Sequence, residues 1–167
     1  MKKVLILLFM MLLTSSGLFA QGQFRAGISG GLPIGDSGDF ATFAIAVDLG
    51  YLFEISDSFD AGVATGYSHS FGDSIDVGGG LTVDIEDVQF IPVAASARFE
   101  VAPSFTLGAD LGYAVGINDG NDGGFYYSPR AQYSVSEAID IVLAFRGVAV
   151  DGGSWDIISA GVEFGID

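Results

Sequence analysis

The sequence predicts an all-β protein, an eight-stranded antiparallel up-and-down transmembrane β-barrel. First, apolar residues alternate with small or polar residues in eight separate stretches. Second, the links between these stretches alternate between short and long. Third, one face of each stretch holds the large apolar side chains, and the other face holds small residues, acids and every arginine. A water-soluble protein has the reverse arrangement, with its charges outside and its hydrocarbon inside.

The first twenty residues have the composition of a secretory signal peptide. Two lysines precede an apolar run from Val4 to Leu13, which is too short to cross a bilayer as a helix. Ala20 is a small residue at the expected cleavage point. The sequence therefore predicts a signal peptide over residues 1–20 and one barrel domain over residues 21–167.

Composition excludes several classes of function. The chain contains no cysteine, which excludes disulfides, thiolate metal sites and cysteine nucleophiles. Loss of the leader would remove both lysines and leave four arginines against 21 acidic residues. Nucleic acid is therefore not an expected partner, because such a chain cannot neutralise phosphates. The 25 glycines are spread through every segment, and they favour strands over helices.

Each alternating stretch is long enough to cross a membrane, since a tilted strand needs about 9 to 11 residues. An even number of strands lets an antiparallel sheet close with both ends on one side. The eight predicted strands are, approximately, Phe24 to Leu32, Phe40 to Ile55, Phe59 to Phe71, Val88 to Val101, Phe105 to Ile117, Phe125 to Val135, Ile139 to Val150 and Trp155 to Ile166.

The connections predict the orientation of the barrel. Three tight connections, within residues 53–59, 99–105 and 133–139, resemble one another in sequence. The links between them are longer and rich in Gly and Asp, and they are Pro33 to Asp39, Gly72 to Asp87, Asn118 to Gly124 and Asp151 to Ser154. Short turns face the periplasm in outer-membrane barrels, so we expect the long loops outside the cell.

Aromatic residues at both ends of the strands predict two girdles at the membrane–water interfaces. The girdle near the short turns consists of Phe53, Phe59, Phe99, Phe105, Tyr133 and Phe164. The girdle near the long loops consists of Tyr67, Phe71, Phe125, Tyr127 and Trp155.

Charged residues on the inward face predict an ion-pair network in the lumen. An eight-stranded barrel is only wide enough for side chains to fill it, so opposite charges should pair. Strand pairing brings Asp110 close to Arg130, and barrel closure brings Arg25 near Glu163. A gated conduction path is the alternative interpretation. The predicted network comprises Arg25, Asp48, Arg98, Asp110, Arg130, Arg146 and Glu163, with Glu54, Asp60, Glu100 and Asp140 nearer the periplasmic rim.

His69 is the only histidine, and it lies on the outward face near the top of its strand. A histidine in this position raises the alternative of an outer-membrane lipid hydrolase. In such an enzyme a histidine acts as base for a serine nucleophile. Ser68 and Ser70 flank His69, but strand parity points them to the opposite face. We therefore expect His69 to be an interfacial side chain beside Tyr67 and Phe71, and we expect no catalytic residue.

The long loops carry many acids, and one interpretation is that their carboxylates and loop carbonyls bind a divalent cation. Residues 118–124 loosely resemble a calcium loop but lack its spacing and its terminal Glu. We prefer solvated, mutually repelling loops, with no resident cofactor or metal. The loop acids are Asp36, Asp39, Asp73, Asp76, Asp84, Glu86, Asp87, Asp119, Asp122, Asp151 and Asp156.

The chain resembles the small outer-membrane β-barrel proteins of the porin family. The resemblance rests on the signal peptide, the eight alternating strands, and segments that contain glycine and aromatic residues, such as Leu107 to Tyr113. The plan is similar to the transmembrane domain of outer-membrane protein A. The resemblance implies a Gram-negative outer membrane, with its lipid and its assembly machinery as partners. We expect a non-enzymatic barrel with an envelope-structural role or a surface role through its acidic loops. The alternatives are a small channel or transporter and, third, a lipid hydrolase.

Overall fold

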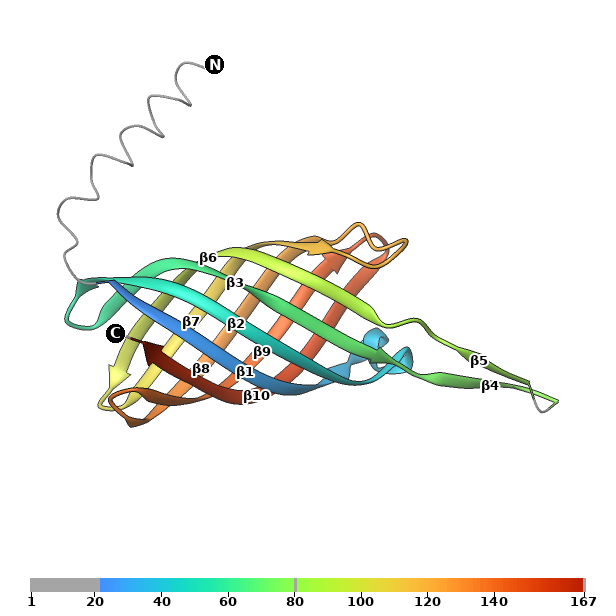
Figure 1. Ribbon diagram of the computed structural model, residues 1–167, viewed down its shortest axis with the longest axis horizontal. Helices are drawn as coiled ribbons and strands as arrows, with labels where there is room; N and C mark the ends of the chain where they lie inside the picture. Colours follow the sequence, from blue (N-terminus) through green and yellow to red (C-terminus); the bar gives the residue numbers. More distant parts are fainter. Residues whose placement is uncertain (1–21, 80, 167) are drawn as a thin grey trace, which may run out of the picture.

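The computed structural model describes residues 22–79 and 81–166, and it shows a closed barrel from which a narrow arm projects (Figure 1). The predicted signal peptide, residues 1–20, lies outside the described residues. Within the described ranges, no helix is long and apolar enough to cross a membrane.

Eight antiparallel strands form the barrel, in the order β1-β10-β9-β8-β7-β6-β3-β2, and the predicted fold class is confirmed. Pairing of the first strand with the last closes the sheet, from Phe24 opposite Ile166 to Ile34 opposite Asp156. The strands are β1 (Gly22–Ile34), β2 (Ala41–Ser56), β3 (Phe59–Gly72), β6 (Val88–Ala102), β7 (Phe105–Gly116), β8 (Gly124–Ser136), β9 (Ile139–Val150) and β10 (Gly153–Ile166).

Three tight turns lie at one end of the barrel, together with the start of β1 and the end of β10 (Figure 1). They follow β2, β6 and β8, as the sequence predicts. At the opposite end lie a short 3-10 helix, η2 (Gly35–Asp39), the arm and the β7–β8 loop. The predicted long link after β9 is instead a turn at Asp151 and Gly152, where Gly152 has φ +86. Glycine adopts this left-handed conformation without strain, so β10 can begin at once.

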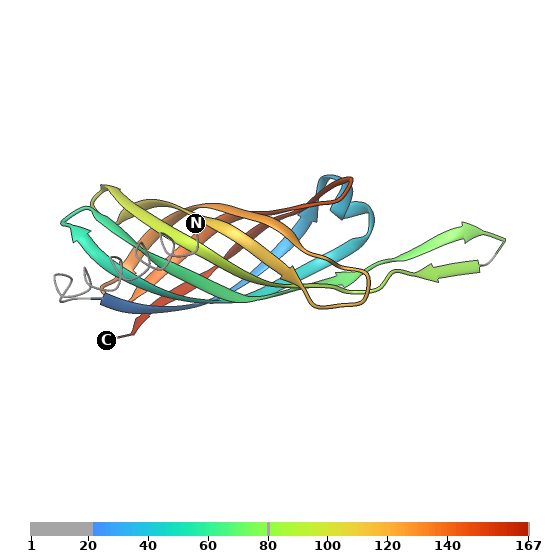
Figure 2. The same cartoon turned by 90° about the horizontal axis from the view of Figure 1, so that it is seen from above.

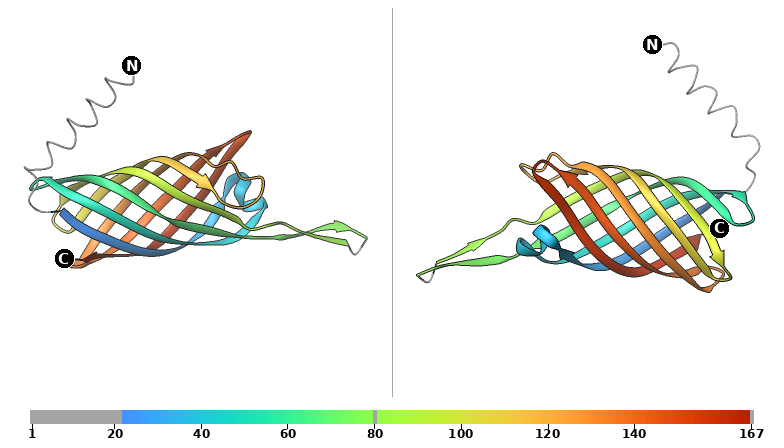
Figure 3. Two further views of the ribbon diagram at one scale, coloured as in Figure 1. Left: turned by 45° about the horizontal axis from the view of Figure 1, so that its top comes forward. Right: turned by 180° about the vertical axis from the view of Figure 1, so that it is seen from behind.

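The arm is a two-stranded hairpin of β4 (Ser74–Gly78) and β5 (Leu81–Asp84), within a segment predicted as a loop. It continues β3 and β6 beyond the rim of the barrel, where no other strand of the described residues flanks it (Figures 2 and 3). The amide N–H of Ile85 donates to the carbonyl oxygen of Asp73 at the base of the arm. The apolar–polar alternation of the arm is short, and its ends are rich in Gly and Asp. For this reason the sequence pattern does not distinguish these two strands from a loop.

The outer surface of the barrel is apolar and the interior is polar. Leu111 and Leu143 lie on the outer surface with 53% and 58% of their area exposed, whereas Asp110 is 1% exposed on the inner surface. Large apolar groups exposed in this way are stable when hydrocarbon surrounds them, and closure leaves no unpaired strand edge within a bilayer.

A charge placed on this outer surface tests whether it contacts lipid. Leu111→Arg, in the middle of β7, should lower the free energy of unfolding by about 2–4 kcal/mol, because the charge would lie near the centre of the bilayer. Ile117→Arg is the matched control, since Ile117 is also exposed but follows the end of β7. It should cost about 0–1 kcal/mol. Urea unfolding of the protein refolded in lipid vesicles measures both values, and equal small costs would contradict a lipid-facing surface.

Candidate functional site

The candidate site is the lumen, where small inward-facing residues leave room for long charged side chains. Gly108 on β7 lies directly opposite Arg98 on β6. A Cβ atom at position 108 would lie 2.6 Å from Arg98 Cδ and 2.8 Å from the carbonyl oxygen of Ala97. The missing side chain therefore allows the arginine to lie across the barrel wall and point into the lumen.

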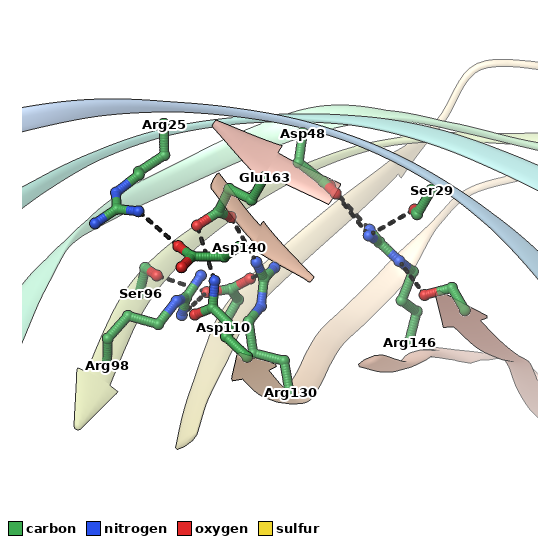
Figure 4. Close-up of polar contacts among 12 residues, drawn as sticks. Arg25, Ser29, Asp48, Ser96, Arg98, Asp110, Arg130, Asp140, Arg146 and Glu163 are labelled. Atoms are coloured by element: carbon green, nitrogen blue, oxygen red, sulfur yellow. Dashed lines mark hydrogen bonds and ion pairs between the residues drawn. The ribbon is translucent and has the colours of Figure 1, made fainter. Parts of the chain in front are cut away.

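Asp110 is the centre of the larger charge cluster (Figure 4). Its Oδ1 accepts hydrogen bonds from Arg98 Nη1 at 2.9 Å and from Ser96 Oγ at 2.6 Å. Its Oδ2 accepts a hydrogen bond from Arg130 Nη2. The Asp110 side chain is 2% exposed, so two guanidinium groups compensate its charge where water has little access.

The same cluster extends from β8 to β10. Arg130 Nη1 donates to Glu163 Oε2 at 3.0 Å, and Gln132 Nε2 donates to Glu163 Oε1 at 2.9 Å. The structure thus brings together Asp110 and Arg130, which the sequence placed near each other. Glu163 lies on β10, and its partners lie on β8. These two strands are not adjacent, because β9 lies between them.

A second cluster surrounds Arg146 on β9. Its Nη1 and Nη2 donate to the two carboxylate oxygens of Asp48 at 2.9 and 2.6 Å. Its Nε donates to Ser159 Oγ at 3.1 Å, and its Nη2 also donates to Ser29 Oγ at 3.2 Å. The two-point contact fixes both the position and the orientation of the guanidinium group across the lumen.

Arg25 does not pair with Glu163, so that prediction was wrong. Arg25 Nη1 donates to Asp140 Oδ2 at 2.8 Å, and Ser134 Oγ donates to Asp140 Oδ1 at 2.6 Å. In the register of β1 and β10, Arg25 lies opposite Gly165, whereas Glu163 lies opposite Gly27. The lumen is narrow enough for side chains to reach strands that are not adjacent, which pairing of neighbouring strands alone does not reveal.

Ion pairs and an apolar layer together close the lumen. The layer comprises the buried Phe90, Ala94, Ala114, Tyr126 and Val148, against which Trp155 packs. Cavities of about 370 Å³ at the short-turn end and about 550 Å³ at the long-loop end flank the closed section. Two spaces within that section measure about 20 and 10 Å³, which is room for about one water molecule each.

Trp155 was predicted in the outer aromatic girdle, and that prediction was wrong. Its side chain packs inside the barrel, where Nε1 donates to Ser70 Oγ at 3.1 Å. Along β10, Ile157 is buried and Ile158 is exposed, so Trp155 shares the inward face with Glu163. Counting residues back from Glu163 in steps of two would have placed Trp155 correctly.

The other predicted girdle residues are half-buried or exposed. Two aromatic residues that the prediction omitted join the girdle near the short turns. Phe24 contacts Tyr51, with ring centroids 4.7 Å apart, and Tyr51 contacts Phe53, with ring centroids 4.9 Å apart. The ten predicted residues concerned are Phe53, Phe59, Phe99, Phe105, Tyr133, Phe164, Tyr67, Phe71, Phe125 and Tyr127.

His69 bonds to a tyrosine and an aspartate. Its Nδ1 lies 2.9 Å from the Tyr67 hydroxyl, and its Nε2 lies 2.8 Å from Asp87 Oδ2. Ser68 and Ser70 are buried on the opposite face of the strand. The backbone N–H of Gly72, together with His69, holds the pKa of the Asp87 carboxyl below its ordinary value. These contacts tie the base of the arm to the barrel.

The acidic loops make local hydrogen bonds. Ser74 Oγ donates to Asp84 at 2.8 Å, and Ser154 Oγ donates to Asp156 at 2.6 Å. Over the part of the chain that the structure describes, no three acidic or histidine side chains lie close enough together to hold a metal ion.

Comparison with known proteins identifies the fold. The sequence matches no protein-family model and no curated protein. The outer-membrane protein Ail of Yersinia pestis, solved in a phospholipid nanodisc, has a TM-score of 0.62 and 15% identity, covering 87% of this chain and all of Ail. A de novo designed transmembrane β-barrel has a TM-score of 0.55 and 12% identity, covering 86% of this chain and 95% of the design.

The protein has the fold of the small outer-membrane β-barrels. A crystal structure of Ail agrees, with a TM-score of 0.56 and 13% identity over 87% of this chain and 97% of Ail. The shared fold and the apolar outer surface described above are those of a barrel that spans a lipid bilayer.

Removal of one partner from the larger cluster should destabilise the barrel strongly. Asp110→Asn leaves Arg98 and Arg130 without their shared carboxylate, so the free energy of unfolding should fall by about 3–5 kcal/mol. The double variant with Arg130→Gln should recover part of this loss, as a coupling energy of about 0.5–3 kcal/mol. Urea unfolding of the four proteins in the cycle measures the coupling. A control cycle of Asp110→Asn with Arg146→Gln should give a smaller value, because these residues share no hydrogen bond in the structure.

The environment of Asp87 predicts a measurable titration. NMR titration should give this carboxyl a midpoint below its ordinary value of 3.8. Because the pKa is lower in the folded state, these contacts stabilise the fold above that ordinary value and are lost as the pH falls through the folded pKa. His69→Phe should raise the midpoint only part of the way, since the Gly72 N–H still donates. Tyr67→Phe, which leaves both contacts to Asp87 in place, should change it little. A full return to 3.8 in His69→Phe would contradict the role of Gly72.

Proposed function

We propose that the protein is a non-conducting, non-enzymatic outer-membrane barrel that contributes to envelope structure and offers an acidic surface to extracellular partners. The closed lumen is the observation that carries the proposal. The cluster around Asp110, the cluster around Arg146 and the apolar layer of Phe90 and Tyr126 separate the cavities at the two ends. A conducting barrel of this size would need a continuous water-filled path, and eight strands leave little room for one.

The charge of the long-loop end supports the surface role. The connections at this end carry eleven acidic residues when Asp156 is counted, and no lysine or arginine. The arm extends part of this acidic surface beyond the rim (Figure 3). Repulsion among these carboxylates favours a solvated surface, and a positively charged partner would relieve it. Outer-membrane lipid surrounds the barrel in this proposal, and the assembly machinery inserts it.

The contacts of His69 support a non-enzymatic role. A hydrolase of the serine type needs a nucleophile within about 2.6–3.2 Å of its base. His69 instead has the Tyr67 hydroxyl and the Asp87 carboxylate as its hydrogen-bonding partners. Ser70, on the opposite face, accepts a hydrogen bond from Trp155 inside the barrel. The His69 imidazole is therefore better suited to hold the base of the arm than to activate a serine.

A small channel is the second candidate, and the cavities at the two ends favour it. A coordinated movement of Arg146, Trp155 and the Asp110 cluster would be needed to join the cavity of about 370 Å³ to the cavity of about 550 Å³. The contacts of Arg146 with Asp48, Ser159 and Ser29 oppose such a movement.

Planar-bilayer recording separates the two candidates. The purified wild-type barrel should show no steady conductance, because paired side chains fill the bore. The paired variant Asp48→Ala with Arg146→Ala removes one obstruction without leaving an unpaired charge, and it should also stay closed, because the Asp110 cluster and the apolar layer remain. A large porin added to the same bilayer controls for insertion and recording. Stable, ion-selective currents from the wild type would overturn the closed-barrel proposal and favour the channel.

A further inference from the structure

The cavity at the long-loop end has the form of a ligand pocket. Its volume of about 550 Å³ lies within the range of about 300–1,000 Å³ that small-molecule sites occupy. Trp155 provides an aromatic floor, supported from below by the buried Phe90, and Asp119, Asp122 and Asp151 line the mouth. The apolar layer below Trp155 ends the cavity, so a ligand that enters from outside would bind there without passing through.

The wall of the pocket is held in place before any ligand arrives. Residues 117–123 connect β7 to β8, and Asn121 Nδ2 in this loop donates to the carbonyl oxygen of Gln89 at 3.0 Å. The Gln89 N–H donates in return to Asn118 Oδ1 at 2.9 Å. The Tyr113 hydroxyl donates to the carbonyl oxygen of Asp122 at 3.0 Å. A loop anchored at these points loses little conformational freedom on binding, and that favours affinity.

The floor of the pocket is equally well fixed. The hydrogen bond from Trp155 Nε1 to Ser70 Oγ orients the indole ring, and Ser70 is fully buried. Trp155 is half-buried and also lines the small space below the floor. Because this bond uses the indole N–H, what the ring offers a ligand is its apolar, electron-rich surface. Such a surface attracts cations as well as hydrocarbon.

The electrostatics of the pocket select positive charge. Three acidic residues line it, and among the residues that the structure describes no arginine or histidine does. Arg146 lies on the other side of the apolar layer with its charge engaged by Asp48. Among the described residues no set of side chains suits a metal ion, and an aromatic floor offers no ligand atom to one. A cation with an apolar group can contact the aromatic floor with that group and the acidic mouth with its charge.

We propose that this pocket binds a small organic cation, such as a quaternary ammonium or an alkyl amine. The apolar part of the ligand packs on Trp155, and its charge lies near Asp119, Asp122 and Asp151. This inference goes beyond the proposed function, because the pocket can bind its ligand whether or not the barrel conducts. Failure of the conductance experiment therefore leaves it standing, and its own failure leaves the closed lumen standing.

Fluorescence titration tests the proposal directly, because Trp155 is the only tryptophan of the chain. The refolded barrel in a neutral maltoside detergent would be titrated with choline and, separately, with its uncharged isostere 3,3-dimethylbutan-1-ol. Choline should change the Trp155 emission in a saturable way, and the isostere should bind at least about tenfold more weakly. Equal affinities, or no saturable change with choline, would overturn the proposal.

Variants at the mouth identify the groups that recognise the charge. Asp122→Asn and Asp151→Asn should each weaken choline binding about three- to tenfold. Asp57→Asn, in a turn at the opposite end of the barrel, is the matched control and should leave binding unchanged. Faster gel migration of unheated samples would show that each variant is folded. Calorimetry with Trp155→Phe should also give weaker binding, independently of the fluorescence signal.

Two outcomes of these measurements would reject the site. Unchanged choline affinity in both Asp122→Asn and Asp151→Asn would mean that the mouth does not recognise the charge. Magnesium chloride that displaces choline more strongly than sodium chloride at equal ionic strength would indicate a general acidic surface. Weaker binding in both variants, with equal effects of the two salts, would support a pocket for organic cations.

Discussion

Closure of the sheet between β1 and β10 is the constraint on which the rest of the structure depends. A bilayer offers no water to backbone N–H and C=O groups, so every strand needs a hydrogen-bonded neighbour on both sides. Eight strands meet this requirement only as a closed ring. The ring then turns one face of each strand to hydrocarbon and the other to a narrow lumen, and this division explains both the apolar exterior and the polar interior.

The narrow lumen gives the interior charges their arrangement. Asp110 is surrounded by Arg98 and Arg130, and Arg146 by Asp48, Ser159 and Ser29, so each buried charge has a partner of opposite sign. Burial of such groups is costly, and their pairing makes it tolerable without making it a large source of stability. The two ends of the lumen differ. Arginines as well as acids line the cavity near the short turns, whereas the described charged residues that line the cavity near the long loops are all acids.

Most of the fold could be predicted because alternation within a strand is a local property of the sequence. The barrel strands, the three tight turns and the inward position of Asp110 and Arg130 follow from it. The arm of β4 and β5 was missed because short strands flanked by Gly and Asp resemble a loop. The pairing of Arg25 with Asp140 was missed for another reason: it joins strands that neighbour pairing does not connect. The inward position of Trp155, by contrast, was available from parity along β10.

The sequence by itself determined which face of each barrel strand meets lipid, how many strands the barrel has, and which end carries the acidic loops. These properties depend on residue spacing and composition, which need no knowledge of distant contacts. Only the tertiary structure decided which charges pair across the lumen, that the apolar layer closes it, and that Trp155 forms the floor of an outer pocket. The physical reason is the curvature of the ring. It brings side chains from non-adjacent strands within hydrogen-bonding distance, and the tilt of the strands sets which of them meet.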